Sequence, residues 1–93
     1  MIRATCFLSG RVQGVGMRFA CHHLAQRFPI TGIVENLPDG RVRLVIEGER
    51  EPIAEYLEAL RHVAPGHLHA IESFESAPSS EFTNFSIRRG EVY

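Results

Sequence analysis

The sequence predicts an α+β sandwich, in which two helices pack on one face of a mostly antiparallel sheet of four to five strands. The first reason is the order of hydrophobic patterns, which runs strand, helix, strand, strand, helix, strand, strand. The second is that both helical segments connect strands within a short chain, which places both on one face of one sheet. The third is the length, because 93 residues supply one modest core. We therefore expect residues 1–93 to form a single domain.

The first strand and the first helix are separated by a glycine-rich loop. Residues 2–9 alternate between apolar and polar side chains, which predicts a strand. Its core-facing side chains are Ile2, Ala4, Cys6 and Leu8. Residues 17–28 repeat apolar side chains at helical spacing, and Pro29 ends this helix. Its apolar stripe consists of Met17, Ala20, Cys21, Leu24, Ala25 and Phe28.

A hairpin and a second helix come next. Strands are predicted at residues 30–36 and 41–48, and the short turn "LPDG" between them makes them a hairpin. Pro52 suits the first turn of the second helix, which ends at "APG". The buried stripe of this helix is expected to be Ile53, Tyr56, Leu57, Leu60 and Val63.

Two strands complete the chain. Residues 67–76 are strand-like, but Ile71 and Phe74 are three positions apart, which predicts a bulge between them. Residues 82–89 form the last strand. The seven elements together make a ferredoxin-like α/β sandwich. Its sheet face away from the helices is expected to be partly open, which suits the charged residues Arg3, Glu35 and Arg43.

The composition excludes several classes of protein. A hydrophobic fraction of 44%, a charged fraction of 23% and a net charge of −1 favour a folded chain without a broad basic surface for nucleic acid. No apolar run is long enough to cross a membrane, and the start "MIRATCFLSG" is not a signal peptide. We therefore expect a cytoplasmic monomer that binds neither nucleic acid nor membrane.

The residue types also limit the chemistry. All ten basic residues are arginine, which excludes a Schiff-base lysine and the lysine of a P-loop. Cys6 and Cys21 are the only cysteines. Both fall on predicted apolar faces, so we expect buried thiols that act as small hydrophobes rather than a disulfide.

The stretch "GRVQGVGMRF", residues 10–19, is the candidate binding loop. It joins the first strand to the start of the first helix, where backbone N–H groups lack helical partners and the helix dipole is positive. Glycines let such N–H groups converge on one phosphate-sized anion, and Arg18 could grip the same anion. Glycine-rich turns of this kind are common and arginines in the first turn of a helix are usually solvated, so the residues alone leave both interpretations open.

The same stretch resembles the signature loop of the acylphosphatase family. That signature reads glycine, x, valine, glutamine, glycine, valine, x, an aromatic residue or methionine, and arginine. The matching residues are Gly10, Val12, Gln13, Gly14, Val15, Met17 and Arg18. The likeness extends over the whole chain in length and element order, including the closing "FTNFSIRR".

A second family signature lies on the predicted hairpin, "GIVENLPDGRVRLVIEG". The matching residues are Gly32, Val34, Asn36, Gly40, Val42 and Gly48. Two positions depart from the pattern, because Ile33 replaces the usual aromatic residue and Glu35 a basic or amide residue. Strand alternation places both on the face opposite Asn36, toward the open side of the sheet.

The resemblance implies hydrolysis of acyl phosphates to a carboxylate and inorganic phosphate, without metal or other cofactor. It implies that the backbone of residues 13–17 binds the phosphoryl group, that Arg18 clamps it and that Asn36 orients the attacking water. The residues of this phosphate loop are Gln13, Gly14, Val15, Gly16 and Met17. Positioning and charge stabilisation suffice for such a reaction, because acyl phosphates have good leaving groups.

Other interpretations remain open at this point. The same cradle could be a phosphate-binding module that does not turn its ligand over, or the fold a purely structural interaction domain. A carbamoyl-phosphate-handling domain of a hydrogenase-maturation protein is disfavoured, since no further domain follows Tyr93. A zinc site could use the His-x-His pair His67 and His69, or the adjacent His22 and His23, but no further ligand stands at a usual spacing. Arg88 and Arg89 are expected to be a solvated strand end.

Overall fold

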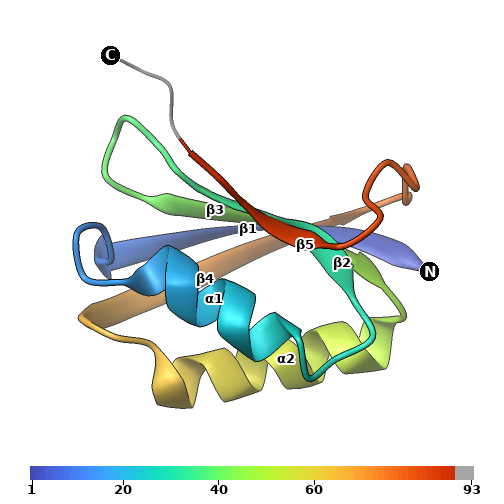
Figure 1. The fold of residues 1–93 in the computed structure, drawn as a ribbon, viewed down its shortest axis with the longest axis horizontal. Helices are drawn as coiled ribbons and strands as arrows, with labels where there is room; N and C mark the ends of the chain where they lie inside the picture. The colour runs from blue at the N-terminus through green and yellow to red at the C-terminus, as the bar shows by residue number, and fades with distance from the viewer. Residues whose placement is uncertain (90–93) are drawn as a thin grey trace.

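The computed structural model describes residues 1–89 and contains five strands and two helices (Figure 1). Each predicted element is present, with ends shifted by up to three residues. In chain order the elements are β1 (Ile2–Arg11), α1 (Met17–Ala25), β2 (Thr31–Asn36), β3 (Val42–Gly48), α2 (Arg50–Val63), β4 (His67–Ser76) and β5 (Phe85–Arg88).

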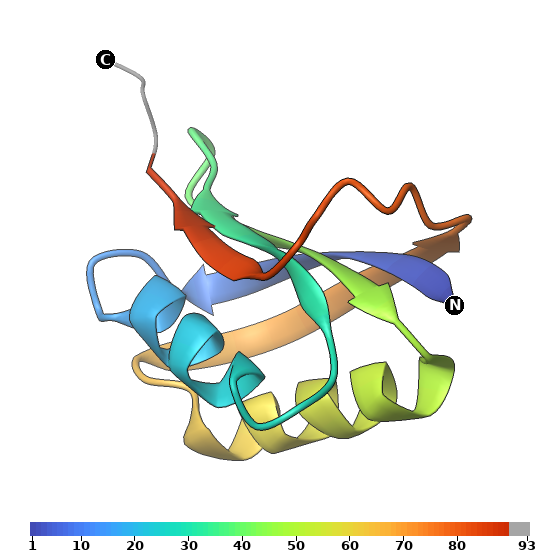
Figure 2. The same ribbon diagram turned by 45° about the vertical axis from the view of Figure 1, so that its right-hand side comes forward.

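The strands form one sheet in the order β4-β1-β3-β2-β5. All neighbouring pairs are antiparallel except β2 and β5, which run parallel. Both helices cover the same face of this sheet (Figures 1 and 2). The predicted fold class, a ferredoxin-like sandwich with a mostly antiparallel sheet, is therefore confirmed, and so is the β2–β3 hairpin.

The core lies between the sheet and the two helices. Alternate residues of β1 and β3 are almost fully buried there, as the alternation predicted. Both cysteines are free thiols in this core. Burial raises the pKa of the Cys21 thiol to about 12, so the thiol stays neutral and unreactive near neutral pH. The hydroxyl of Tyr56 on α2 donates to the carbonyl oxygen of Cys21 on α1 at 2.8 Å, which ties the two helices together.

Two expectations about local structure are wrong. Val63 was expected in the buried stripe of α2, but its side chain is 55% exposed because it is the last residue of the helix and projects beyond the packed turns. The bulge of β4 was expected between Ile71 and Phe74. Strand pairing instead steps from Ala70 to Leu68 opposite Ser9 and Gly10, which leaves His69 as the extra residue.

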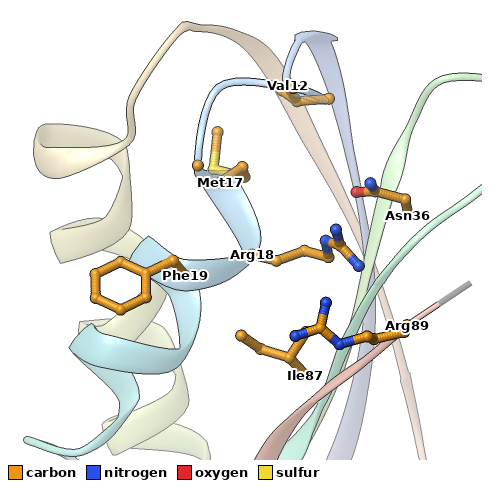
Figure 3. A pocket seen from close by; sticks show the side chains of 9 residues that line it. Val12, Met17, Arg18, Phe19, Asn36, Ile87 and Arg89 are labelled. Carbon is orange, nitrogen blue, oxygen red and sulfur yellow. The ribbon is translucent and has the colours of Figure 1, made fainter.

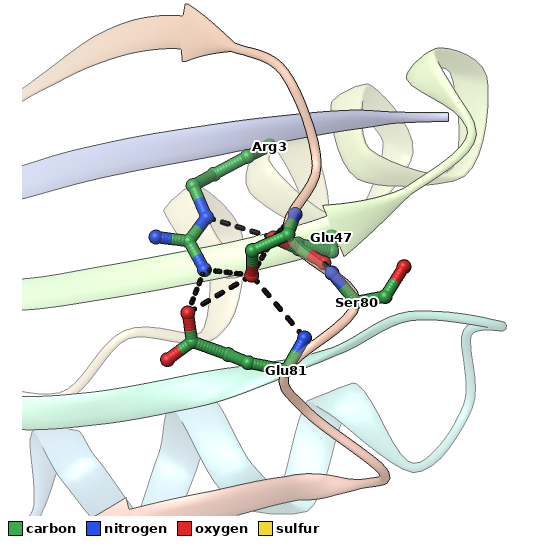
Figure 4. Close-up of polar contacts among 5 residues, drawn as sticks. Arg3, Glu47, Ser80 and Glu81 are labelled. Atoms are coloured by element: carbon green, nitrogen blue, oxygen red, sulfur yellow. Dashed lines mark hydrogen bonds and ion pairs between the residues drawn. The ribbon is translucent and has the colours of Figure 1, made fainter.

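The sheet face away from the helices is partly covered by the connection from β4 to β5. Because these strands lie at opposite edges of the sheet, residues 77–84 must cross it. Glu47 of β3 holds this crossing segment, because its buried carboxylate accepts hydrogen bonds from the backbone N–H groups of Ser79 (2.7 Å) and Ser80 (2.9 Å) and from Arg3 Nε (2.8 Å) (Figure 4). Ile33 lies on this face and is 6% exposed, so the face is less open there than expected.

Burial opposes the negative charge of Glu47, but the hydrogen bonds outweigh it. The bonds from Ser79, Arg3 and Ser80 lower the pKa of this carboxyl to about 2. The carboxylate therefore stays ionised well into the acid range and keeps the crossing segment in place.

None of the helices within residues 1–89 combines the length and the apolar character that a membrane span requires.

Candidate active site

A cleft opens where the start of α1 meets the ends of β2 and β5 (Figure 3). Its volume is about 290 Å³, near the lower end of the range for sites that bind small molecules. The residues that line it are Val12, Gly14, Gly16, Met17, Arg18, Phe19, Asn36, Ile87 and Arg89. None of these nine is acidic and two are arginines, so the cleft favours an anion.

The glycines of the loop adopt backbone conformations that other residues rarely take. Gly14 has φ 75° and Gly16 has φ 88°, both in the left-handed region. Gly16 is also the N-cap of α1, and no side chain in the described part of the chain, residues 1–89, caps this helix end. The first N–H groups of α1 are thus left without side-chain acceptors beside the cleft, where the helix dipole adds positive potential.

Arg18 is the second residue of α1 and leaves the helix on the cleft side. Its neighbour Met17 is 2% exposed and anchors the helix start in the core. The Arg18 side chain is half-buried and extends across the cleft toward Asn36 (Figure 3). One guanidinium nitrogen, Nη1, donates to the carbonyl oxygen of Arg88 at 3.5 Å, a long bond that leaves most of its donors for a ligand.

Asn36 is the last residue of β2 and faces the cleft. Strand alternation places it on the helix side with Val34, which is fully buried. At the strand end the packing gives way, and Asn36 is only half-buried. Among residues 1–89 its side-chain amide has no hydrogen-bond partner. The amide is therefore available to a bound molecule or to water.

The cleft brings together five of the seven predicted site residues, namely Gly14, Gly16, Met17, Arg18 and Asn36. Gln13 and Val15 do not line it. The Val15 side chain packs against the hydrophobic core instead. The Gln13 side-chain amide donates to the carbonyl oxygens of Leu37 (2.7 Å) and Arg41 (2.9 Å) in the β2–β3 turn, a contact that the sequence did not suggest.

Arg89 is exposed, as expected of a solvated strand end, but it also lines the cleft, which was not expected. Its guanidinium lies beside Ile87 in Figure 3, on the side of Arg18 away from Met17. Strand alternation could have predicted this position, because Phe85 faces the core and every second residue after it, Ile87 and then Arg89, lies on the same side of the sheet. Val12, Phe19 and Ile87 also line the cleft without having been predicted as site residues.

The departures from the family pattern lie on the far face of the sheet. Glu35 forms an ion pair with Arg43 and lies 3.8 Å from Arg88 Nη1, so its charge points away from the cleft. Ile33 pairs with Val45 across the neighbouring strand. Neither residue lines the cleft.

The histidines do not gather with other possible metal ligands. Within residues 1–89 no three His, Cys, Asp or Glu side chains are placed to hold a metal ion together. His23 stacks on Phe19 at 5.8 Å between ring centroids, and His22 lies 6.4 Å from the ring of Phe85. His67 and His69 are exposed on β4.

Comparison with known proteins identifies the family. The acylphosphatase family model matches residues 4–87. An acylphosphatase of Methylococcus capsulatus is 39% identical over 90 residues, which cover 96% of this chain and 98% of that protein. The crystal structure of acylphosphatase from Bacillus subtilis superposes with a TM-score of 0.85 at 30% identity, covering all of both chains. T. kodakarensis HypF matches with a TM-score of 0.86 at 28% identity, over 98% of this chain but 12% of that one. The chain therefore belongs to the acylphosphatase family, whose enzymes hydrolyse acyl phosphates to a carboxylate and inorganic phosphate.

Proposed function

We propose that the cleft is the active site of this acyl phosphate hydrolysis. The observation that carries the proposal is the convergence of Arg18, Asn36 and the N-terminus of α1 on one cleft, which no acidic residue among residues 1–89 lines. An acyl phosphate presents a phosphoryl group whose three terminal oxygens share up to two negative charges, and these three features supply complementary donors.

The phosphoryl group is held by the loop and by Arg18. The left-handed conformations at Gly14 and Gly16 allow the loop backbone, residues 13–17, to turn its N–H groups toward a bound anion. The Arg18 guanidinium adds a planar pair of donors. In the transition state the equatorial oxygens of the phosphoryl group carry negative charge, which donors aimed at them stabilise. The loop N–H groups and Arg18 therefore both bind the substrate and accelerate its reaction.

Asn36 positions the attacking water. A side-chain amide does not titrate near neutral pH, so Asn36 orients the water by hydrogen bonding and does not act as a base. A phosphate oxygen of the substrate can take the water's proton. The acyl carboxylate is a good leaving group, and orientation together with charge stabilisation therefore accounts for the catalysis without a strong base.

The variant Asn36→Ala tests this assignment. We expect its turnover number for benzoyl phosphate to fall about 100- to 1000-fold, as when a single preorganised donor is lost. Its affinity for inorganic phosphate should change little, because the loop and Arg18 remain. Kinetics and phosphate titration calorimetry measure the two quantities, and Asn84→Ala, an exposed asparagine outside the cleft, is the matched control.

Two outcomes would contradict the proposal. Full turnover in Asn36→Ala would exclude Asn36 as the residue that positions water. If the wild-type protein binds phosphate but does not hydrolyse benzoyl phosphate, the cleft is a binding module. The monomeric state, the cytoplasmic location and the absence of nucleic-acid binding stay predictions, and gel filtration checks the first of them.

A further inference from the structure

The Gln13 side chain links two parts of the cleft that lie far apart in sequence. Gln13 opens the phosphate loop, whereas Asn36 ends β2. The Gln13 amide nitrogen, Nε2, donates to Leu37 O at 2.7 Å and to Arg41 O at 2.9 Å. Backbone carbonyls only accept hydrogen bonds, so the NH₂ group must face them, and both of its protons are used.

The two acceptors belong to the turn that follows Asn36 directly. Leu37 N donates to Arg41 O at 2.8 Å, and Gly40 N donates to Leu37 O at 3.1 Å, so the turn is closed by its own backbone bonds. Gln13 therefore attaches to a fixed structure. The first of its partners is the residue next to Asn36, which means that a shift of this attachment moves Asn36 as well.

The backbone ladder does not provide the same link. β1, which leads into the phosphate loop, pairs with β3 and β4 but not with β2. The ladder between β1 and β3 ends at Leu8 and Val42, before the loop and the turn begin. Among residues 1–89, the side-chain hydrogen bonds that join the loop to the turn are those of Gln13.

We propose that Gln13 is a positioning residue, which fixes the water-orienting Asn36 relative to the phosphate loop. This inference rests on the proposed function of the cleft. The Gln13 side chain is half-buried and does not line the cleft, so this side chain acts through the turn and not on the substrate. A glutamine fits this role because its amide reaches two carbonyls at once without bringing a charge.

Two variants of the same length separate hydrogen bonding from shape. Gln13→Met keeps the bulk and loses both donors, and Gln13→Glu keeps the shape but places carboxylate oxygens against the two carbonyls. We expect both to lower the turnover number for benzoyl phosphate about 10- to 100-fold, since a displacement of about 1 Å costs up to 100-fold. Phosphate affinity should change less than about threefold, because the loop and Arg18 belong to one segment.

The matched control is Gln26→Met. Gln26 is the other glutamine of the chain, and its Nε2 donates to His22 O at 3.0 Å, beyond the end of α1 and away from the cleft. We expect wild-type turnover from this variant. Circular dichroism and thermal unfolding establish that each variant is folded, and bound inorganic phosphate reports an intact loop.

A double-mutant cycle with Asn36→Ala tests the route of the effect. If Gln13 acts through Asn36, adding Gln13→Met to Asn36→Ala lowers turnover by less than about threefold. A full further loss in that background would overturn the proposal, and so would wild-type turnover in Gln13→Glu, which would leave shape as the only requirement. A parallel loss of phosphate affinity would assign Gln13 to the loop alone. Failure of the proposed function is recognised separately, because Asn36→Ala by itself would then keep its turnover.

Discussion

Arg18 occupies a position that is unfavourable for a cation in the free protein. In the first turn of α1 its charge opposes the helix dipole, and no acidic residue stands in that turn to offset it. Arg89 from the end of β5 lines the same cleft. A bound dianion would compensate both guanidinium groups and the helix end together. Under the proposed function, the same charges cost stability in the absence of substrate and would stabilise the complex with substrate.

Replacing Arg18 by alanine should leave the fold intact and nearly abolish turnover. The variant loses the charge-assisted hydrogen bonds to the phosphoryl group, which contribute roughly 1.5–3 kcal/mol to binding and more in the transition state. Phosphate affinity should fall at least tenfold in titration calorimetry. Arg27→Ala, which removes an exposed arginine beyond α1, is the control. Wild-type phosphate affinity in Arg18→Ala would remove Arg18 from the binding site.

The phosphate loop and α1 act as one element, because the loop ends in the N-cap of the helix. Gly16 has a left-handed backbone, yet a Cβ atom built there would meet no atom within 4 Å. A side chain at this position is therefore strained by the backbone alone and not by a steric clash. The strain is relieved if the peptide units around residue 16 rotate, which would turn the N–H groups away from the anion.

We expect Gly16→Ala to lose about 1–2 kcal/mol of unfolding free energy, the usual cost of a left-handed residue. Its phosphate affinity should also fall under conditions in which the variant is fully folded, because the rotated N–H groups no longer face the anion. Gly16→Asn is the matched variant, because asparagine tolerates this conformation, and it should keep more affinity. Urea unfolding and phosphate titration measure both effects. Equal affinities in the two variants would show that the backbone conformation at residue 16 does not control binding.

The histidines of β4 offer a test at the level of one strand. His67 and His69 are exposed and gather no further ligand within the described part of the chain. We expect EDTA to leave the hydrolysis rate of benzoyl phosphate unchanged. If the rate is lost with chelator and restored by zinc or magnesium, the reaction depends on a metal. His67→Ala with His69→Ala would then show whether this strand supplies the ligands.

At the level of the whole molecule, the crossing segment 77–84 joins the two edges of the sheet. The Glu47 carboxylate accepts backbone hydrogen bonds from this segment and forms an ion pair with Arg3 Nε, while Arg3 Nη2 lies 2.8 Å from Glu81 Oε1. A buried carboxylate that lost these partners would carry a large desolvation cost. Attachment of the segment is therefore linked to ionisation of one side chain.

Stability should fall in acid because of Glu47. Its pKa is lowered from 4.5 to about 2 in the folded protein, so the stabilisation is present above pH 4.5 and is lost as the pH falls toward 2. The contribution is on the order of 3 kcal/mol. Glu47→Gln should flatten the dependence of the unfolding free energy on pH in this window. Glu55→Gln, on the exposed side of α2, should not. An unchanged profile in Glu47→Gln would assign the acid dependence to other carboxyls.

The sequence alone predicted the elements and most of the loop and helix residues that line the cleft. Apolar side chains repeat at strand and helix spacing, and this local pattern predicts where β1, α1 and the β2–β3 hairpin lie. Gly14, Gly16 and Arg18 could be predicted because a loop and the helix start that follows it are adjacent in the chain. Asn36 could be placed because alternation along one strand fixes which face it occupies.

Only the tertiary structure decided the contacts between distant segments. Gln13 meets carbonyls 24 and 28 positions away, and Arg3 meets Ser79 across 76 positions. These contacts depend on the strand order, which places β5 beside β2 and sends residues 77–84 across the sheet. Local periodicity carries no information on strand order. The strand order is selected by the free energy of burying the apolar faces of all strands and helices together. For that reason the attachment of Gln13 to the β2–β3 turn and the anchoring of the crossing segment by Glu47 were visible only in the folded chain.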